Sequence, residues 1–145
     1  MLLLLAVACT PAKPPVSAAK ARIKLVALAA ESDAFPKIAK ATTDALARAK
    51  VSSVDDTTTS KVSIEVVQLS IECVDPTTSC YEAAAKSLSA NKLLFAQIDS
   101  SGKKPKVAVT LFDVATRAPK TTARTFDTEA AAIAGVDQLV SEVTQ

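Results

Sequence analysis

The chain is 145 residues long, enough for one domain with a real core and a short extension, and its formal net charge is +2. So small a charge excludes the strongly basic surface that nucleic-acid binding requires, and four Phe and one Tyr are too few for a platform that stacks bases or sugars. The chain has no His and only two Gly, which excludes His-dependent catalytic triads and Gly-rich phosphate loops.

The chain begins with an apolar run, Leu2–Ala8, that is followed by Cys9. The run is too short to cross a bilayer but has the length of a signal-peptide h-region. Residues 5–9, Leu-Ala-Val-Ala-Cys, resemble a bacterial lipobox, in which the Cys is acylated and becomes the mature amino terminus. We therefore expect a signal peptide over residues 1–8 and lipidation of Cys9, with translation starting upstream because no Lys or Arg precedes the run. The alternative is a hydrophobic end that is only disordered or buried.

Residues 9–21 are expected to form a lipidated tether. This segment contains Pro11, Pro14 and Pro15, which favour an extended chain of about 3.1 Å per residue and hence a reach of roughly 30–40 Å. By resemblance to enterobacterial lipoproteins, Thr10 after the Cys is not an inner-membrane retention signal. The expected location is therefore the periplasmic face of the outer membrane, which the protein contacts through its lipid anchor.

The other two cysteines, Cys73 and Cys80, are separated by six residues that include Pro76 and Thr77, so that the chain can reverse between them. A disulfide closing so short a ring would stabilise the fold by roughly 2–3 kcal/mol. The alternative is a pair of reduced, buried thiols. Export favours the disulfide, and acylation of Cys9 leaves an even number of cysteines. We expect no metal site and no redox catalysis, because His and a Cys-x-x-Cys motif are absent.

The first half of the folded part is predicted to alternate strand and helix. Arg22–Leu28 is apolar on both faces, which indicates a strand inside the sheet. Ser32 or Asp33 is expected to cap the helix that follows. Val51–Val54 predicts a short second strand, and residues 55–60 a polar loop. The core stripe of the helix consists of residues at helical spacing: Phe35, Ile38, Thr42, Ala45, Leu46 and Ala49.

The segment Lys61–Glu72 fits either a helix or a strand. The β-branched residues within it favour a strand. Ile64, Val67 and Ile71 nevertheless keep helical spacing, and Ser63 is a suitable N-cap. We favour the helix.

The second half is predicted to contain two helices and three strands. Ser79 and Glu82 match a capping box for a helix that runs to Ala90. Its core stripe is Tyr81, Ala84, Ala85 and Leu88. The strands are Leu93–Asp99, Lys106–Asp113 and Lys120–Phe126, the last polar enough for a sheet edge. Asp127 or Thr128 caps the final helix, whose core stripe is Ile133, Val136, Leu139, Val140 and Val143.

The predicted order of elements is β-α-β-α-α-β-β-β-α. It indicates an α/β (α+β) fold in which a mixed sheet of about five strands carries helices packed on it, as a single domain over residues 22–145.

From Arg22 onward the pattern resembles the TolB amino-terminal-like domain, which is related in fold to the curli-secretion lipoprotein CsgG. The likeness rests on the paired cysteines before a helix and on two short signatures. Residues 88–94, Leu-Ser-Ala-Asn-Lys-Leu-Leu, are similar to Leu-Gly-Ala-Asp-x-Leu-hydrophobic. Residues 111–116, Leu-Phe-Asp-Val-Ala-Thr, are similar to the strand end Leu-hydrophobic-Asp-x-x-Thr, with Arg117 in place of the usual Gly. The resemblance implies a module without catalytic activity that works through protein contacts.

Two sets of charged residues remain. Asp75, Asp99 and Asp113 each end an element, and we interpret them as caps and turn residues rather than as a cation or acid–base site. Lys103, Lys104 and Lys106 form a basic hairpin tip. This tip is either a solvated turn or a contact surface for an anionic lipid, a glycan or an acidic partner.

The sequence therefore favours a lipid-anchored periplasmic module that binds or assembles proteins of an envelope complex. We expect neither enzymatic activity nor a cofactor. The alternative function is a periplasmic sensor or carrier that holds a small ligand in a pocket at the sheet edge.

Overall fold

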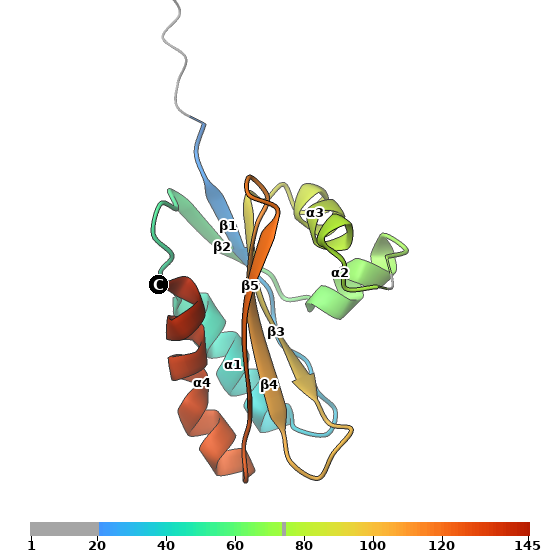
Figure 1. Cartoon of the computed structure of the whole chain (residues 1–145), viewed down its shortest axis with the longest axis vertical. Helices are drawn as coiled ribbons and strands as arrows, with labels where there is room; N and C mark the ends of the chain where they lie inside the picture. Colours follow the sequence, from blue (N-terminus) through green and yellow to red (C-terminus); the bar gives the residue numbers. More distant parts are fainter. Residues whose placement is uncertain (1–20, 74) are drawn as a thin grey trace, which may run out of the picture.

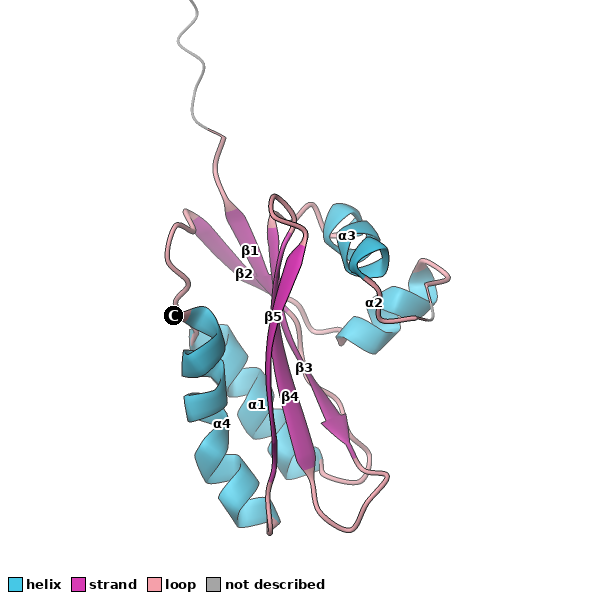
Figure 2. Ribbon diagram, viewed as in Figure 1, coloured by secondary structure: helices cyan, strands magenta, loops and turns pink. Residues whose placement is uncertain are grey.

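A computed structural model describes residues 21–73 and 75–145. The chain forms the predicted order of elements, and the fold is α+β with a mixed five-stranded sheet (Figures 1 and 2). The expected signal segment over residues 1–8, the lipidation site Cys9 and all of the tether except residue 21 lie outside the described residues. The elements are β1 (Lys24–Ala27), α1 (Pro36–Arg48), β2 (Asp56–Thr59), α2 (Ile64–Ser70), α3 (Thr78–Ser87), β3 (Lys92–Asp99), β4 (Lys106–Asp113), β5 (Ala118–Thr125) and α4 (Glu129–Thr144).

The sheet has the strand order β2-β1-β3-β4-β5. β1 is parallel to both of its neighbours, whereas β3, β4 and β5 form an antiparallel meander. Leu25 and Val26 of β1 are almost fully buried on opposite faces, which confirms the interior position that the apolar pattern predicts. β5 is an edge strand, as expected, and Pro119 removes one backbone donor from it.

Helices cover the two faces of the sheet unequally. α1 and α4 lie side by side along one face, while α2 and α3 lie against only the upper part of the other (Figure 1). Side chains alternate accordingly: Leu94 and Ala96 of β3 pack in the cluster under α1 and α4, and Leu93 and Phe95 pack in the cluster under α2 and α3. One part of the second face is therefore left without a helix.

The predicted strand at Val51–Val54 is wrong. The second strand is Asp56–Thr59, inside the segment that we expected to be a polar loop. All four of its residues are exposed, so no hydrophobic alternation marks it in the sequence. It is a strand because its β-branched Thr residues pair with β1, Leu25 opposite Thr57 and Val26 opposite Thr58.

The ambiguous segment Lys61–Glu72 contains the helix that we favoured. α2 begins after Ser63, whose buried hydroxyl accepts a hydrogen bond from the backbone N–H of Val66 at 3.4 Å. Ile64 and Val67 point into the core. The cap and the helical spacing therefore outweigh the β-branched content.

The caps of three other helices differ in part from expectation. α3 begins before Ser79, because Thr77 Oγ1 accepts from the N–H of Cys80 at 3.3 Å, so the Ser79–Glu82 capping box is wrong. Glu82 instead forms an ion pair with Arg117 at 3.0 Å.

The expected cap of α1 by Ser32 or Asp33 is wrong. α1 has no side-chain cap and starts with Pro at its first position. α4 is capped by Thr128, one of its two expected residues.

One member of the predicted stripe of α4 is not in the core. Ile133 is 37% exposed, and Ala132 is buried in its stead. The remaining four members, Val136, Leu139, Val140 and Val143, are buried as predicted.

Candidate functional site

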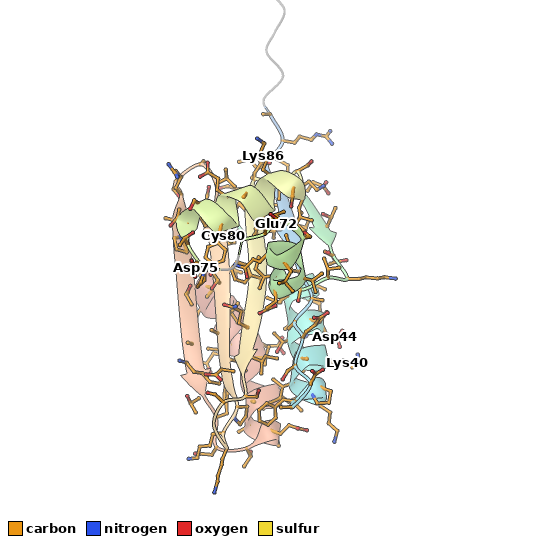
Figure 3. The ribbon with its side chains drawn as sticks, turned by 90° about the vertical axis from the view of Figure 1, so that its right-hand side faces the viewer. Lys40, Asp44, Glu72, Asp75, Cys80 and Lys86 are labelled. Atoms are coloured by element: carbon orange, nitrogen blue, oxygen red, sulfur yellow. A yellow bond between two sulfur atoms is a disulfide. The ribbon has the colours of Figure 1, made fainter. Side chains whose placement is uncertain are left out.

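The two helices on the partly covered face are held together by a disulfide. Cys73, just after α2, is bonded to Cys80 in the first turn of α3, with 5.7 Å between their Cα atoms. Gln68 of α2 supports the junction: its carbonyl accepts from the N–H of Cys73 at 2.9 Å, and its side-chain amide donates to Cys80 Sγ at 3.3 Å. Figure 3, in which Cys80 is labelled, looks onto this layer. The structure thus contains the pairing that the spacing of the two cysteines predicts.

The outer side of α2 is apolar. Val66 is 40% and Leu69 is 72% exposed, and Val62, just before the helix, is 37% exposed. We call these three residues the α2 stripe: Val66 and Leu69 are three residues apart on the helix, and Val62 directly precedes its N-cap, Ser63. In the described part of the chain, Ile133 is the one other large apolar side chain that is exposed. The exposed apolar surface is therefore concentrated on one short, braced helix.

Next to α2 the uncovered part of the sheet is hollowed. Two shallow cavities of about 350 Å³ and about 260 Å³ adjoin there, since Glu65 and Ile98 line both of them. We call the combined hollow the trough. Figures 1 and 3 show that no helix crosses the strands on this side of α2. The lining residues are Glu31, Ser32, Asp33, Glu65, Gln97, Ile98, Asp99, Lys106 and Ala108.

Carboxylates dominate the trough. Asp99 at one end has a lowered pKa, because the backbone and side chain of Ser101 donate hydrogen bonds to its carboxylate and Lys106 adds a positive charge. Glu31 at the other end accepts a hydrogen bond from the hydroxyl of Ser63 at 3.1 Å. One carboxylate oxygen of Glu65, Oε2, is buried and has no hydrogen-bond partner within the described residues.

Glu65 connects the trough to the aromatic core. The ring of Tyr81 packs on those of Phe95 and Phe112, at centroid distances of 5.1 and 5.7 Å. Burial raises the pKa of Tyr81, and the negative charge of Glu65 raises it further. Tyr81 is the only Tyr of a chain without Trp, so its optical signal reports on the surroundings of Glu65.

The predicted basic tip does not form one free cluster. Lys104 pairs with Asp127 at 2.5 Å, and Lys106 lies opposite Asp99 in the β3–β4 pair. Lys103 is in the exposed turn between these strands. The turn is at the end of the domain opposite the start of β1 (Figure 1).

The structure does not bring together the acidic residues Asp99 and Asp113, which stand at the ends of strands. Asp99 and Asp113 lie at opposite ends of the β3–β4 pair. Asp113 pairs with Lys92 and also accepts from the N–H of Ala115 at 2.9 Å. These contacts are those of turn and cap residues, in agreement with the interpretation from the sequence.

The sequence reasoning missed the α2 stripe and three acids of the trough, Glu31, Asp33 and Glu65. A signal for the stripe was present, because a helix with Ile64 and Val67 on its inner side necessarily has Val66 and Leu69 elsewhere. The acids come from separate segments, and no sequence motif unites them.

The described residues contain no group of three or more side chains that could hold a metal ion. None of the helices in residues 21–73 and 75–145 is both long and apolar enough to span a membrane.

Comparison with known proteins gives three structural similarities. No family model matches the chain, and no curated protein does. The LpoB C-terminal domain from Salmonella enterica is similar at a TM-score of 0.45 and 15% identity, over 77% of this chain and 87% of that one. A PelC dodecamer from Paraburkholderia phytofirmans gives 0.39 and 16%, over 84% and 86%. TolB from Acinetobacter baumannii gives 0.42 and 12%, over 85% of this chain but only 28% of TolB. Because each TM-score is below 0.5, we base neither family nor function on them.

Proposed function

We propose that the protein is a lipid-anchored, periplasmic module of an envelope complex that binds another protein and has no catalytic activity. The observation that carries this proposal is the α2 stripe. Its three side chains are exposed on, or directly before, a helix that is capped by Ser63 and joined by a disulfide to α3. Exposed apolar side chains on an ordered element are a common feature of protein-binding surfaces.

The size of the stripe suits a compact binding site. Burying one Val or Leu side chain fully contributes about 1.5–3 kcal/mol. Three neighbouring side chains can therefore supply a cluster of the kind that dominates many interfaces. The disulfide keeps the backbone of α2 ordered before binding, which lowers the entropic cost of association.

Three features of the sequence support the envelope location. Residues 5–9 resemble a lipobox with Cys9 as the acylated residue. The Cys73–Cys80 pair suits an oxidising compartment. The TolB amino-terminal-like signatures belong to a module found in envelope lipoproteins. Together they support anchoring at the periplasmic face of the outer membrane, with residues 9–21 as the tether.

Site-specific photo-crosslinking in the native host tests the binding function. A photoreactive amino acid at Leu69 is expected to give a discrete adduct with a second envelope protein. The same amino acid at Lys40, exposed on α1 at the opposite face, is the control and is expected to give none. Absence of any adduct at Leu69, Val66 and Val62 under several growth conditions would refute the proposal.

Lipid anchoring is tested separately. Cys9→Ser is expected to abolish incorporation of labelled fatty acid and to release the protein from the membrane fraction. Unchanged mass and unchanged fractionation of the variant would rule out acylation at Cys9.

The alternative, a small-ligand sensor or carrier, is favoured by the trough, whose larger cavity of about 350 Å³ has polar groups at Gln97, Asp99 and Lys106. A thermal-shift screen with envelope metabolites distinguishes the two functions. A saturable shift that Gln97→Ala removes would favour the carrier, provided that Leu69 gives no adduct.

A further inference from the structure

The α2 stripe and the trough are parts of one continuous surface. Glu65 lines both cavities of the trough, and Leu69 follows it by four residues on the same helix. Residues four apart lie next to each other on a helix surface. The most exposed apolar side chain of the domain therefore stands beside the most central carboxylate of the trough.

The charges along the trough are unevenly balanced. Lys106 lies opposite Asp99 in the β3–β4 pair, so the two charges at that end offset each other. At the other end, Glu31, Asp33 and Glu65 form no ion pair with any Lys or Arg of the described residues. Within residues 21–73 and 75–145, the one side-chain hydrogen bond to these three carboxylates is that of the Ser63 hydroxyl to Glu31. This end consequently carries uncompensated negative charge.

A cation of the partner can contact the carboxylates at this end. Glu31 and Asp33 are exposed and Glu65 is partly exposed, although its Oε2 is shielded from solvent and lacks a donor within the described residues. A guanidinium offers five N–H donors in a plane, and an ammonium offers three, whereas both carry the positive charge that the carboxylates lack. Charge-assisted hydrogen bonds of this kind are about twice as strong as neutral ones.

The basic hairpin turn of a second copy of this chain does not fit the surface well. This exposed turn contains Lys103 and Lys104, but the residues around them, Ser100, Ser101 and Gly102, are polar or small. No apolar side chain in that turn could cover Leu69. Lys104 is moreover already paired with Asp127.

We infer that this surface binds a segment of a different protein in which a Lys or Arg is next to a large apolar residue. The apolar residue covers Leu69 and Val66, and the basic side chain enters the trough between Glu65 and Asp33. This inference rests on the proposed function, since it specifies the chemistry of the same partner. The charge of Glu65 near Tyr81 supplies a way to observe occupancy.

The test compares two charge-neutralised variants of the full chain in the native host. Both carry the photoreactive amino acid at Leu69. One variant has Asp33→Asn and Glu65→Gln, and its matched control has Asp44→Asn and Asp56→Asn, which remove the same charge outside the trough. We expect the adduct of the first to fall about tenfold and that of the control to stay within about twofold.

Thermal unfolding of the purified variants shows whether each one folds. If the first variant is folded and keeps its adduct within twofold of the unsubstituted chain, the inference about the cation is wrong while the proposed function stands. If the unsubstituted chain forms no adduct, the proposed function itself fails.

A second measurement does not depend on either variant. Mass spectrometry of the Leu69 adduct identifies the crosslinked peptide of the partner. We expect a Lys or Arg within about four residues of the crosslinked position, because that spacing places both side chains on one face of a helix or on nearby positions of an extended segment. A neutral or acidic peptide would overturn the inference.

Discussion

Gly135 of α4 lies directly against the ring of Phe126. A Cβ placed on Gly135 would stand 2.5 Å from Cε1 of Phe126, well inside normal contact distance. Phe126 is 7% exposed and belongs to the core under α1 and α4, so its ring has little room to move. The absence of a side chain at Gly135 is therefore what lets α4 approach the core this closely.

We expect Gly135→Ala to destabilise the protein, although Ala is the better helix former by about 0.8–1 kcal/mol. Overpacking a filled core costs about 1–3 kcal/mol, which exceeds that gain. Urea unfolding should therefore show a net loss of up to about 2 kcal/mol. In the background Phe126→Leu the same substitution is expected to cost less. An increase in stability for Gly135→Ala alone would contradict this account of the contact.

Removal of the disulfide is expected to weaken the brace between α2 and α3. Closing a ring of this length is worth about 2–3 kcal/mol, so Cys73→Ala with Cys80→Ala should lower the free energy of unfolding by about that amount. The wild-type protein after reduction is the matched comparison, because it retains both side chains. Equal urea midpoints for oxidised and reduced wild type would show that the ring contributes no net stability.

The ion pair between Lys92 and Asp113 makes part of the stability dependent on pH. Partial burial raises the pKa of Asp113, but the hydrogen bonds from Lys92 and from the backbone of Ala115, together with the charge of Lys92, lower it more, and the net pKa is below its usual value. The carboxylate is thus more acidic in the folded than in the unfolded chain. Its contribution is complete above the unfolded pKa of about 3.9 and is lost as the pH falls through the lower folded value.

Asp113→Asn is accordingly expected to cost about 1–2 kcal/mol at neutral pH. The difference from wild type should shrink as the pH falls below about 4, because the wild-type carboxylate is then also neutral. Urea midpoints measured from pH 7 to pH 2.5 check both expectations. A difference that stayed constant over this range would exclude the ionised carboxylate as its source.

The pKa of Tyr81 reports on Glu65. Burial and then the charge of Glu65 raise this pKa, so Glu65→Gln is expected to lower it while leaving it above its usual value. Ultraviolet titration measures it without ambiguity, since the chain has one Tyr and no Trp. Asp44→Asn, which changes a carboxylate on α1, is the control. An identical titration curve for Glu65→Gln would mean that the two side chains do not interact.

The sequence predicted the elements whose apolar residues keep the spacing of a strand or of a helix. The strand Lys106–Asp113 was predicted at its observed ends, because Val107 and Val109 point one way and Phe112 the other. α2 was identified through its cap, Ser63. β2 was missed because an exposed edge strand has no apolar pattern, and its pairing with β1 is supplied only by the folded sheet.

The candidate site was predictable only in part. The spacing of Cys73 and Cys80 permits their pairing, and the expected export favoured a disulfide over two reduced thiols. The trough was not predictable, because Glu31, Glu65 and Asp99 belong to three segments that meet only when β1, α2 and β3 take their places. The exposure of Leu69 was not predictable either, because it depends on how α2 packs on the sheet.

The central place of β1 in the sheet has a consequence for the order of assembly. This strand is made first, yet one of its two neighbours is β3, and Val26 meets Leu93 only after three helices and β2 have been made. The meander of β3, β4 and β5 pairs strands that follow one another in the chain, so its pairing does not depend on a distant segment. We therefore expect pulse-labelling hydrogen exchange to show the amides of the meander protected before those of β1. The pairing of β1 with β3, unlike its pairing with β2, cannot form until more than half of the domain has been made.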